Sequence, residues 1–311
     1  MGKIAFLFSG QGAQYVGMGK ELYENIDECR KVFQEADTAL GFPISKICFE
    51  GPEEDLNSTE NTQPAILTVS IAVLKALESK GIKADVTAGL SLGEYSALVY
   101  SGVLEFQEAV KLVKKRGRYM QEAVPQGIGA MAAVLGVDEE KIREVCNECS
   151  NLGVVEPANL NCPGQIVIAG EVKAVEAACE KAKEKGALKT VMLSVSGPFH
   201  TSMLKPAADK LEKELDHIVI KNLDIPVITN VTGEIIDSKE DIKPYLKRQV
   251  MSSVLFEKSI RTMMDMGVDT FIEIGPGKAL SGFVKKINRK AVILNVQDLK
   301  SLENTLEKLG K

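Results

Sequence analysis

Short apolar runs separated by helical patterns dominate the chain. The runs are rich in β-branched residues and mostly lack the alternation of a half-exposed strand, which is typical of buried parallel strands. They occupy residues 4–8, 86–90, 226–231, 270–274 and 292–296. Helical patterns lie between them, such as 64–80, which Pro64 opens and Gly81 closes. This order predicts an α/β fold on a mostly parallel sheet.

The middle of the chain has a different rhythm and predicts a separate unit. Its patterns follow a β-α-β-β-α-β order, over residues 128–136, 138–149, 153–156, 164–169, 171–185 and 188–195. Turn residues lie before and after it, at 125–127 and 197–198. We therefore expect a ferredoxin-like subdomain at 126–197, inserted into a larger α/β domain formed by 1–125 and 198–311.

Composition and charge indicate a globular protein and argue against several other classes. With 311 residues, of which 45% are hydrophobic and 26% charged, the chain is typical of a globular protein with a full core. The net charge of −5 argues against general nucleic-acid binding, which needs a basic surface. No apolar stretch reaches the roughly 18 residues of a membrane span, and the run after Lys3 is too short for a signal peptide. We expect a cytoplasmic protein with neither a membrane nor a nucleic-acid partner.

The cysteines predict neither disulfides nor a metal site. Six are present without framework spacing, and thiols stay reduced in the cytoplasm. Cys146 and Cys149 form a lone CxxC with no second pair and no nearby histidine. We interpret that spacing as a coincidence on a helix surface.

The strongest candidate for chemistry is the stretch Gly89-Leu90-Ser91-Leu92-Gly93. It follows a predicted strand and precedes a helical pattern, which is the context of a nucleophile elbow. The glycines permit the close backbone approach of a sharp strand-to-helix turn, and the turn exposes the serine hydroxyl at the carboxyl edge of the sheet. The context predicts Ser91 as a nucleophile.

A serine nucleophile needs a base, and histidine is the usual one. The chain contains two histidines. His217 follows an amphipathic helix among charged residues, which indicates a surface or helix-end position. His200 lies in a Gly-Pro turn after the strand predicted at 188–195, at the carboxyl end of a strand, where open α/β sheets bind ligands. We therefore predict His200 as the base.

One arginine lies on the apolar face of its helix. The helical pattern at 104–121 places most of its cations on the solvent side, but Arg116 lies within about 60° of Val113 on the apolar stripe. A buried cation requires an anion. That anion is either an internal carboxylate or a substrate carboxylate, which a guanidinium can hold by two parallel hydrogen bonds. The residues alone leave both interpretations open.

The glycine-rich loop after the first apolar run, FSGQGAQYVGMGK at 8–20, fits no phosphate-binding pattern. A dinucleotide fingerprint would need glycine at position 15, which is Tyr15, and a triphosphate loop would need glycine at position 14, which is Gln14. The loop offers backbone donors and the amides of Gln11 and Gln14, but these do not identify its ligand.

A series of blocks resembles malonyl-CoA:acyl carrier protein transacylases: FSGQGAQYVGMG, NTQPAI, GLSLGEYSAL, RGRYMQEAVPQGIGAM, NCPGQIVIAG, SGPFH, KPAADKL and EIGPGKAL. The blocks cover nearly the whole chain in order. The resemblance implies an α/β-hydrolase-like core with the inserted ferredoxin-like subdomain. It also implies transfer of a malonyl group from malonyl-CoA to the phosphopantetheine thiol of acyl carrier protein, by a ping-pong reaction through an acyl-serine that supplies fatty-acid biosynthesis.

The resemblance assigns roles to single residues. Ser91 would be the nucleophile and His200 its base, oriented by the backbone carbonyl at position 249 in place of an acidic residue. Arg116 would hold the malonyl carboxylate. The backbone N–H groups of Gln11 and Leu92 would form the oxyanion hole. Further substrate-binding positions would be Gln63, Asn159, Phe199 and Gln249.

One position departs from the family pattern. Leu90 stands just before the nucleophile, where the family commonly has histidine, which implies a change in pocket polarity or acyl selectivity. Phe199 resembles the residue of malonyl-selecting members, whereas methylmalonyl-selecting relatives tend to carry a smaller one. We therefore expect malonyl as the acyl group.

Acyl carrier proteins are acidic, so the resemblance predicts a locally basic docking surface. Candidate patches are 114–118, 243–249 and 285–290. We expect a monomer with no metal and no permanently bound cofactor, for which coenzyme A is substrate and product. Two other functions stay open: a serine hydrolase in which water accepts the acyl group, and a nucleotide-binding module based on the first loop and residues 275–278.

Overall fold

The computed structural model describes residues 2–125, 127–195 and 197–311. Its larger part is built on a parallel sheet in the order β2-β1-β7-β8. The strands are β1 Lys3–Phe8, β2 Val86–Gly89, β7 Val268–Ile274 and β8 Val292–Val296. Because β1 is buried from Ala5 to Phe8, its sequence is continuously apolar rather than alternating. The predicted α/β class with a parallel sheet is confirmed.

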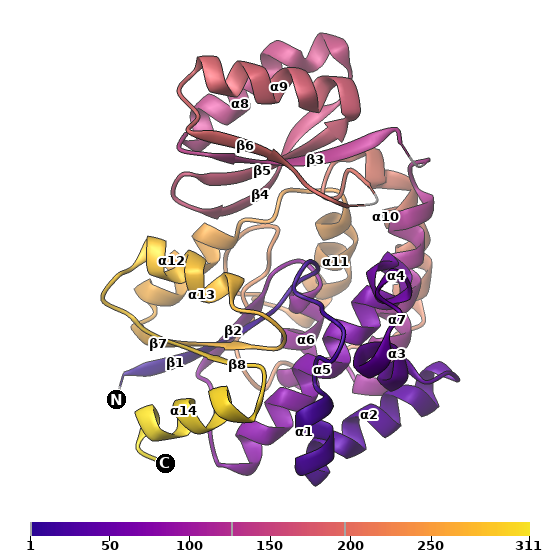
Figure 1. Cartoon of the computed structure of the whole chain (residues 1–311), viewed down its shortest axis with the longest axis vertical. Helices are drawn as coiled ribbons and strands as arrows, with labels where there is room; N and C mark the ends of the chain where they lie inside the picture. Colours follow the sequence, from indigo (N-terminus) through magenta and orange to yellow (C-terminus); the bar gives the residue numbers. More distant parts are fainter. Residues whose placement is uncertain (1, 126, 196) are drawn as a thin grey trace.

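Helices cover both faces of this sheet, since Phe6 and Phe8 pack into one hydrophobic cluster and Ala5 and Leu7 into another. Figure 1 shows their arrangement. The helices are α1 Lys20–Asn25, α2 Asp27–Leu40, α3 Ile44–Glu50, α4 Glu53–Asn57, α5 Thr59–Ser79, α6 Gly93–Tyr100, α7 Phe106–Glu122, α10 Lys205–Asp216, α11 Ile242–Val250, α12 Phe256–Asp265, α13 Ala279–Ile287 and α14 Leu299–Leu309. Short 3₁₀ turns lie at Ser150–Leu152, Ser202–Leu204 and Lys239–Asp241.

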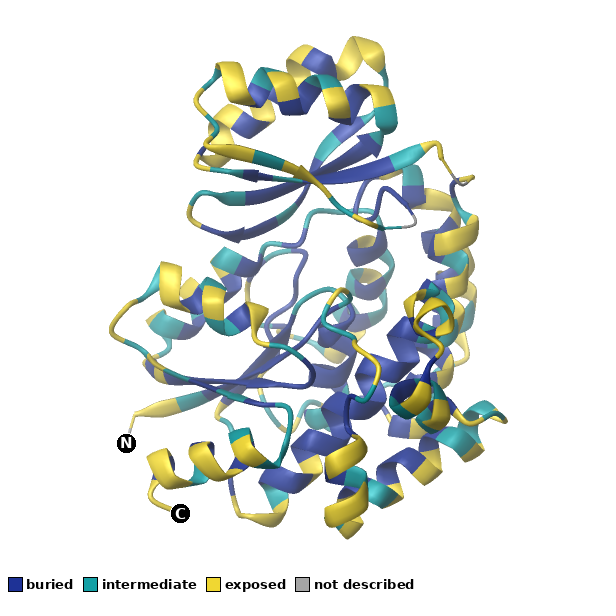
Figure 2. Cartoon of the chain, viewed as in Figure 1, coloured by how far each residue is buried: buried dark blue, intermediate teal, exposed yellow. Residues whose placement is uncertain are grey.

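Helix α5 forms the centre of the larger core. Every position from Thr62 to Leu77 except Lys75 is buried, and Figure 2 shows the helix dark along most of its length. A helix that is apolar all round is stable only inside a protein. Burial of each of its large aliphatic side chains contributes roughly 1.5–3 kcal/mol to the stability of the folded protein. Packing on α5 therefore stabilises the elements around it.

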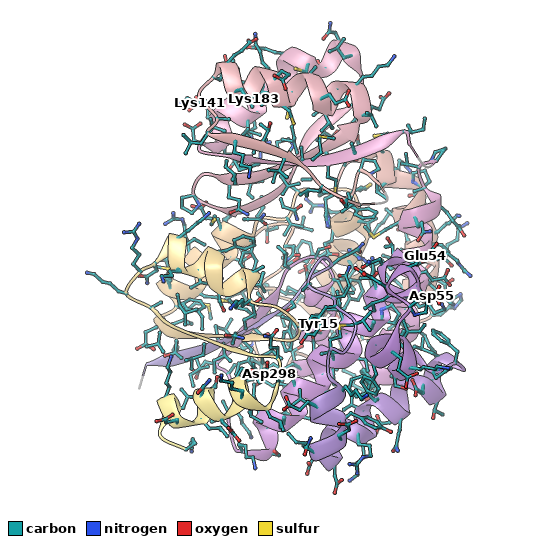
Figure 3. The ribbon with its side chains drawn as sticks, viewed as in Figure 1. Tyr15, Glu54, Asp55, Lys141, Lys183 and Asp298 are labelled. Carbon is teal, nitrogen blue, oxygen red and sulfur yellow. The ribbon has the colours of Figure 1, made fainter. Side chains whose placement is uncertain are left out.

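The smaller part forms an antiparallel sheet in the order β4-β5-β3-β6. Its helices α8 and α9 pack on one face, at the top of Figure 1. Lys141 and Lys183, labelled in Figure 3, lie on the exposed side of these helices. The elements follow the predicted β-α-β-β-α-β order: β3 Gly129–Leu135, α8 Glu139–Cys149, β4 Val155–Cys162, β5 Gln165–Glu171, α9 Val172–Glu184 and β6 Lys189–Met192.

The predicted start of the helix at 64–80 is wrong. Helix α5 begins at Thr59, five positions before Pro64, which lies inside it. The carbonyl of Ser58 accepts the N–H groups of Asn61 and Thr62 and so forms the first turn upstream of the proline. Proline is common at the first helical position, but in this helix tertiary packing extends the element past it.

The strand predicted at 226–231 is also wrong. Val227 makes an isolated parallel bridge to Thr87 in β2, and no longer strand forms. Asn230 instead directs its side chain to the end of β2, where its Nδ2 donates to the carbonyl of Gly89 over 2.7 Å. A side chain that bonds the backbone in this way competes with a continuing strand ladder. The segment therefore becomes a loop that lies against the end of β2.

The two cysteines of the CxxC lie on α8, but the prediction of a surface position is wrong. Cys146 and Cys149 are both buried in the core of the smaller part. Burial raises the pKa of Cys146 to about 12, so this thiol is protonated and unreactive at neutral pH. Within the described residues, no group of three or more His, Cys, Asp or Glu side chains could hold a metal ion.

The two parts of the molecule meet along β4. The N–H of Leu160 donates to the carbonyl of Val254, and the N–H of Val254 donates to the carbonyl of Ala158, each over 2.9 Å. The predicted subdomain boundary at 126 lies outside the described residues. In the described part of the chain, no helix is long and apolar enough to cross a membrane.

Candidate active site

Ser91 lies in the sharp turn between β2 and α6, with a φ of 52° that is unusual for a residue with a side chain. The glycines of the turn have no room for one. A Cβ on Gly89 would lie 1.9 Å from the carbonyl carbon of Gly93, and a Cβ on Gly93 would lie 2.1 Å from the carbonyl oxygen of Phe8. Close packing of α6 against β1 and β2 therefore requires the glycines of the GxSxG pattern.

His200 lies beside this serine, although 109 positions separate them in the sequence. Its Nε2 is 2.7 Å from Ser91 Oγ, and its Nδ1 is 2.8 Å from the backbone carbonyl oxygen of Gln249. Because a carbonyl can only accept, Nδ1 carries the proton and Nε2 accepts from the serine hydroxyl. The structure brings the predicted nucleophile and base together. The other histidine, His217, stands at the end of α10.

Burial controls the charge of the His200 imidazole. The residue is 4% exposed, and burial, reinforced by the positive charge of Arg116, lowers its pKa to about 4. The hydrogen bond to the carbonyl of Gln249 opposes this shift in part. At neutral pH the imidazole is therefore uncharged, which is the form that can take a proton from a serine.

Arg116 is buried on α7, as its position on the apolar stripe predicted, and is 1% exposed. Its Nη1 donates to the amide oxygen of Gln63 over 2.8 Å. Its Nη2 donates to the amide oxygen of Gln249 over 3.0 Å and to Ser91 Oγ over 3.2 Å. Within the described residues it forms no salt bridge, and its Nε has no hydrogen-bond partner. Neutral side-chain oxygens hold the cation, and the charge of the buried Glu94 acts on it without a direct ion pair.

Gln249, on α11, connects the reacting groups and is fully buried. Its side-chain oxygen accepts from Arg116, and its backbone carbonyl accepts from His200. Its Nε2 donates to the carbonyl of Ser91 over 3.0 Å and to Oε2 of Glu94 over 2.7 Å. Gln249 thus contacts Ser91, His200 and Arg116.

Two residues of this network were not predicted from the sequence. Glu94 is fully buried on α6, and burial raises the pKa of its carboxyl group. Asn230 accepts the N–H of Ser91 at its Oδ1 over 2.7 Å. The available indication for Glu94 was its charge: it is the single charged residue of the stretch GEYSALVY, three positions after Ser91. Asn230 lies in segment 226–231, whose apolar pattern predicts a strand and gives no indication of a site residue.

The first loop packs against the elbow. A Cβ on Gly10 would lie 2.5 Å from the carbonyl oxygen of Leu90, so glycine is required for this approach. The side chain of Gln11 is fixed by a 3.3 Å hydrogen bond to Thr59. The backbone N–H groups of Gln11 and Leu92 make no hydrogen bond within the described residues. Free backbone donors next to a nucleophile are what a developing oxyanion needs.

A cavity of about 350 Å³ opens onto Ser91 and His200. The predicted substrate-binding residues Asn159 and Phe199 line it. Gln63, Arg116 and Gln249 are buried and do not form its wall. The cavity therefore has an inner layer, in which amide groups hold the guanidinium next to the serine.

A larger hollow of about 720 Å³ lies between the β4–β5 turn, the start of α8 and α12, and it contains none of the groups described above. Its arginines are paired within their own helices, Arg143 with Glu139 and Arg261 with Glu257. Size alone therefore does not identify the reactive cavity.

The candidate basic patches differ in how far their charges are neutralised. Patch 285–290 has four exposed cations, none of which forms an ion pair within the described residues. In this patch Lys286 donates to the neutral amide oxygen of Gln165 over 2.8 Å. Ion pairs occupy cations of patches 114–118 and 243–249, through Lys114–Glu60, Lys115–Glu214 and Lys247–Glu212.

Comparison with known proteins gives the class first. Residues 5–302 match the acyl transferase domain family, so nearly the whole chain, with its serine elbow, is an acyltransferase domain.

Individual relatives narrow the class further. The chain is 53% identical over 310 residues to the malonyl CoA-acyl carrier protein transacylase of Bacillus subtilis, covering 99% of this chain and 98% of that protein. The crystal structure of the transacylase of that name from Clostridium perfringens matches with a TM-score of 0.97 at 55% identity, covering 99% of this chain and 97% of that one. A chain from the complex of a type II PKS acyl-carrier protein with its malonyl-transacylase matches with a TM-score of 0.96 at 42% identity, covering 98% and 99%. The chain belongs to the malonyl-CoA:acyl carrier protein transacylase family.

Proposed function

We propose that this enzyme transfers the malonyl group from malonyl-CoA to the phosphopantetheine thiol of acyl carrier protein, by a ping-pong reaction through an acyl-serine. One observation carries the proposal: Ser91 and His200 open onto one cavity, and the cation of Arg116, which forms no salt bridge within the described residues, lies directly behind the serine, 3.2 Å from its Oγ. A hydroxyl with a neutral imidazole supplies a nucleophile. A buried guanidinium that has no ion pair in the described part of the chain supplies a place for an acyl carboxylate. The names of the relatives support the substrate pair.

In the first half-reaction, His200 Nε2 takes the proton of Ser91 Oγ while the oxygen attacks the thioester carbonyl carbon. Negative charge develops on the carbonyl oxygen, to which the N–H groups of Gln11 and Leu92 would donate. When the intermediate collapses, the C–S bond breaks and His200 returns the proton to the sulfur of coenzyme A. Malonyl-Ser91 remains.

In the second half-reaction, the carrier thiol gives its proton to His200 and its sulfur attacks the acyl carbon on Ser91. The bond between the acyl carbon and Oγ then breaks, and His200 returns the proton to the serine oxygen. The scheme uses coenzyme A and phosphopantetheine only as parts of the substrates, so no permanently bound cofactor takes part.

The remaining residues would define the acyl and pantetheine sites. Phe199 limits the space beside the base, which favours an unbranched malonyl group. Leu90 gives the wall an apolar surface where the family commonly has histidine. Asn159 and Asn161 offer side-chain amides to the amide groups of pantetheine, and Asn161 Oδ1 has no partner within the described residues. Gln63 acts indirectly, by holding Arg116.

We also propose the finer architecture and setting. The antiparallel order β4-β5-β3-β6 supports a ferredoxin-like subdomain at 126–197, and the parallel sheet with its serine elbow supports an α/β-hydrolase-like core formed by 1–125 and 198–311. The enzyme would act as a cytoplasmic monomer in fatty-acid biosynthesis, without a membrane or nucleic-acid partner.

Intact-mass measurement after mixing with malonyl-CoA tests the proposal. We expect wild type to gain one malonyl group and Ser91→Ala to gain none. Adding holo acyl carrier protein should remove the group and load the carrier, whereas apo carrier, which lacks the thiol, is the matched control. Loss of the label to water as fast as to the holo carrier would contradict the proposal and favour a hydrolase.

A further inference from the structure

Glu94 is a buried carboxylate that takes no direct part in the scheme above. It lies on the first turn of α6, three positions after the nucleophile, and is 0% exposed. Its Oε2 accepts two hydrogen bonds, from Nε2 of Gln249 over 2.7 Å and from the backbone N–H of Asn230 over 3.0 Å. Each of these two partners contacts the reacting groups.

The first partner fixes the base and the cation. Gln249 presents its carbonyl to Nδ1 of His200 and its side-chain oxygen to Arg116. The orientation of its side-chain amide decides which end faces the guanidinium, because only the oxygen can accept. By accepting from the Nε2 end, Glu94 fixes that orientation and directs the oxygen toward Arg116.

The second partner fixes the nucleophile. Asn230 Oδ1 accepts the N–H of Ser91 over 2.7 Å, and Asn230 Nδ2 donates to the carbonyl of Gly89 over 2.7 Å. These bonds clamp the two sides of the elbow, whose serine has a strained positive φ. Glu94 holds the backbone of Asn230 in place, across 136 positions of sequence.

A purely structural role explains Glu94 poorly. A buried carboxylate normally has every lone pair satisfied, since an unpaired one is costly. Oε1 of Glu94 makes no hydrogen bond of good geometry within the described residues, and the nearby side chain of Thr229 offsets only part of the rise in pKa that burial causes. Such an incompletely satisfied group is typical of a position retained for a site rather than for stability.

We propose that Glu94 is a positioning residue for acyl transfer: its Oε2 sets Gln249 and Asn230 at once, and so aligns the nucleophile with its base. The inference rests on the roles proposed above for Ser91 and His200. It predicts that the hydrogen-bonding oxygen at this position matters more than the charge.

The test compares Glu94→Ala, Glu94→Gln and Glu94→Asp by the steady-state kinetics of malonyl transfer and of acetyl transfer. Misplacing a reacting group by about 1 Å costs on the order of 100-fold, so Glu94→Ala should lose about 100-fold in kcat for both donors with little change in KM. Glu94→Gln keeps an oxygen at the same reach and should stay within about 10-fold of wild type. Glu94→Asp keeps the charge but is one methylene shorter, so it should be slower than Glu94→Gln.

Glu273→Ala is the matched control. Glu273 is also a buried carboxylate, but it accepts the backbone N–H groups of Leu280 and Ser281 at the start of α13. This variant should lower the melting temperature without changing kcat of the folded enzyme. The inference is overturned if Glu94→Ala retains kcat within about threefold of wild type, or if Glu94→Gln falls as far as Glu94→Ala.

Two further measurements distinguish a failure of this inference from misfolding of a variant and from a failure of the proposed function. If Glu94→Ala does not fold, the order of Glu94→Asp and Glu94→Gln decides, and a faster Glu94→Asp contradicts the inference. If malonyl-CoA does not load wild type, the proposed function fails. The rate of Ser91 labelling by phenylmethylsulfonyl fluoride, followed by intact mass, then tests the same order of variants, since this reaction needs only the aligned serine and imidazole.

Discussion

The imidazole of His200 donates its Nδ1–H to the backbone carbonyl of Gln249 over 2.8 Å. In serine enzymes with a triad, a carboxylate orients this nitrogen and stabilises the imidazolium that forms. A neutral carbonyl orients the ring but stabilises the charged form less. Burial, reinforced by the positive charge of Arg116, lowers the His200 pKa to about 4, and the hydrogen bond to this carbonyl opposes the shift only in part. The imidazole therefore remains uncharged far below neutral pH.

This low pKa predicts a pH dependence of stability. The pKa of His200 is about 4 in the folded protein, against 6.5 for an ordinary histidine. Between these values the unfolded chain binds a proton that the folded protein does not, so the His200 contribution to stability is complete above pH 6.5 and is lost as the pH falls toward 4. A difference of this size corresponds to roughly 3 kcal/mol.

Urea unfolding of wild type and His200→Gln at pH 4.5 and pH 7 measures this contribution. We expect the free energy of unfolding to fall less on acidification in His200→Gln than in wild type. Equal pH dependence in wild type and His200→Gln would show that burial does not depress the His200 pKa.

The guanidinium of Arg116, for which the described residues offer no salt bridge, predicts different effects on malonyl and acetyl transfer. Hydrogen bonds to a charged group contribute about 1.5–3 kcal/mol, so Arg116→Ala should lose roughly 10- to 100-fold in malonyl transfer. Acetyl transfer should be spared or improved, because acetyl has no carboxylate to bind. Arg118→Ala, an exposed position on the same helix, is the control. An equal loss for malonyl and acetyl would contradict the role of Arg116 as a carboxylate clamp.

Local sequence patterns were sufficient to predict the elbow at Ser91 and the inward position of Arg116. Ser91 was identifiable because an elbow needs glycine on both sides, and the packing distances at Gly89 and Gly93 show why. The inward position of Arg116 follows from helical periodicity alone. His200 was reachable by elimination, since the chain has only two histidines.

The other two residues of the network, Asn230 and Glu94, make long-range contacts that no local sequence pattern predicts. Asn230 and Glu94 meet across 136 positions, and neither the GxSxG pattern nor helical periodicity specifies a partner for a buried carboxylate. The error at 226–231 has the same origin: the segment is apolar enough for a strand, but the side chain of Asn230 binds the end of β2 instead. The error at Pro64 has a related origin. Proline commonly stands at the first position of a helix, but tertiary packing extends α5 upstream of Pro64, and the local sequence does not record that packing.

The elbow glycines predict a sharp stability difference within the chain. In Gly93→Ala the new methyl would lie 2.1 Å from the carbonyl oxygen of Phe8, and a backbone atom cannot move aside as a side chain does. We expect a loss of about 2 kcal/mol or more and no acylation of Ser91. Gly282→Ala meets nothing within 4 Å in helix α13, so it should gain about 0.5–1 kcal/mol. Thermal unfolding and intact mass measure both effects, and a fully active Gly93→Ala would contradict the required close approach.

The charge distribution predicts where the carrier protein docks. In patch 285–290 the exposed cations form no ion pairs within the described residues, so an acidic partner need not displace an internal carboxylate, unlike at Lys115, which is paired with Glu214. The double change Lys285→Glu with Arg289→Glu should slow the carrier half-reaction about 10-fold at low salt, and less as salt rises, because surface charge acts mainly on encounter. Loading from malonyl-CoA should be unchanged.

Lys183→Glu on α9 is the control, since Lys183 is paired with Glu180 at the outer surface of the smaller part. Slower loading of Ser91 from malonyl-CoA, or an equal effect of Lys183→Glu on the carrier step, would place the docking surface elsewhere.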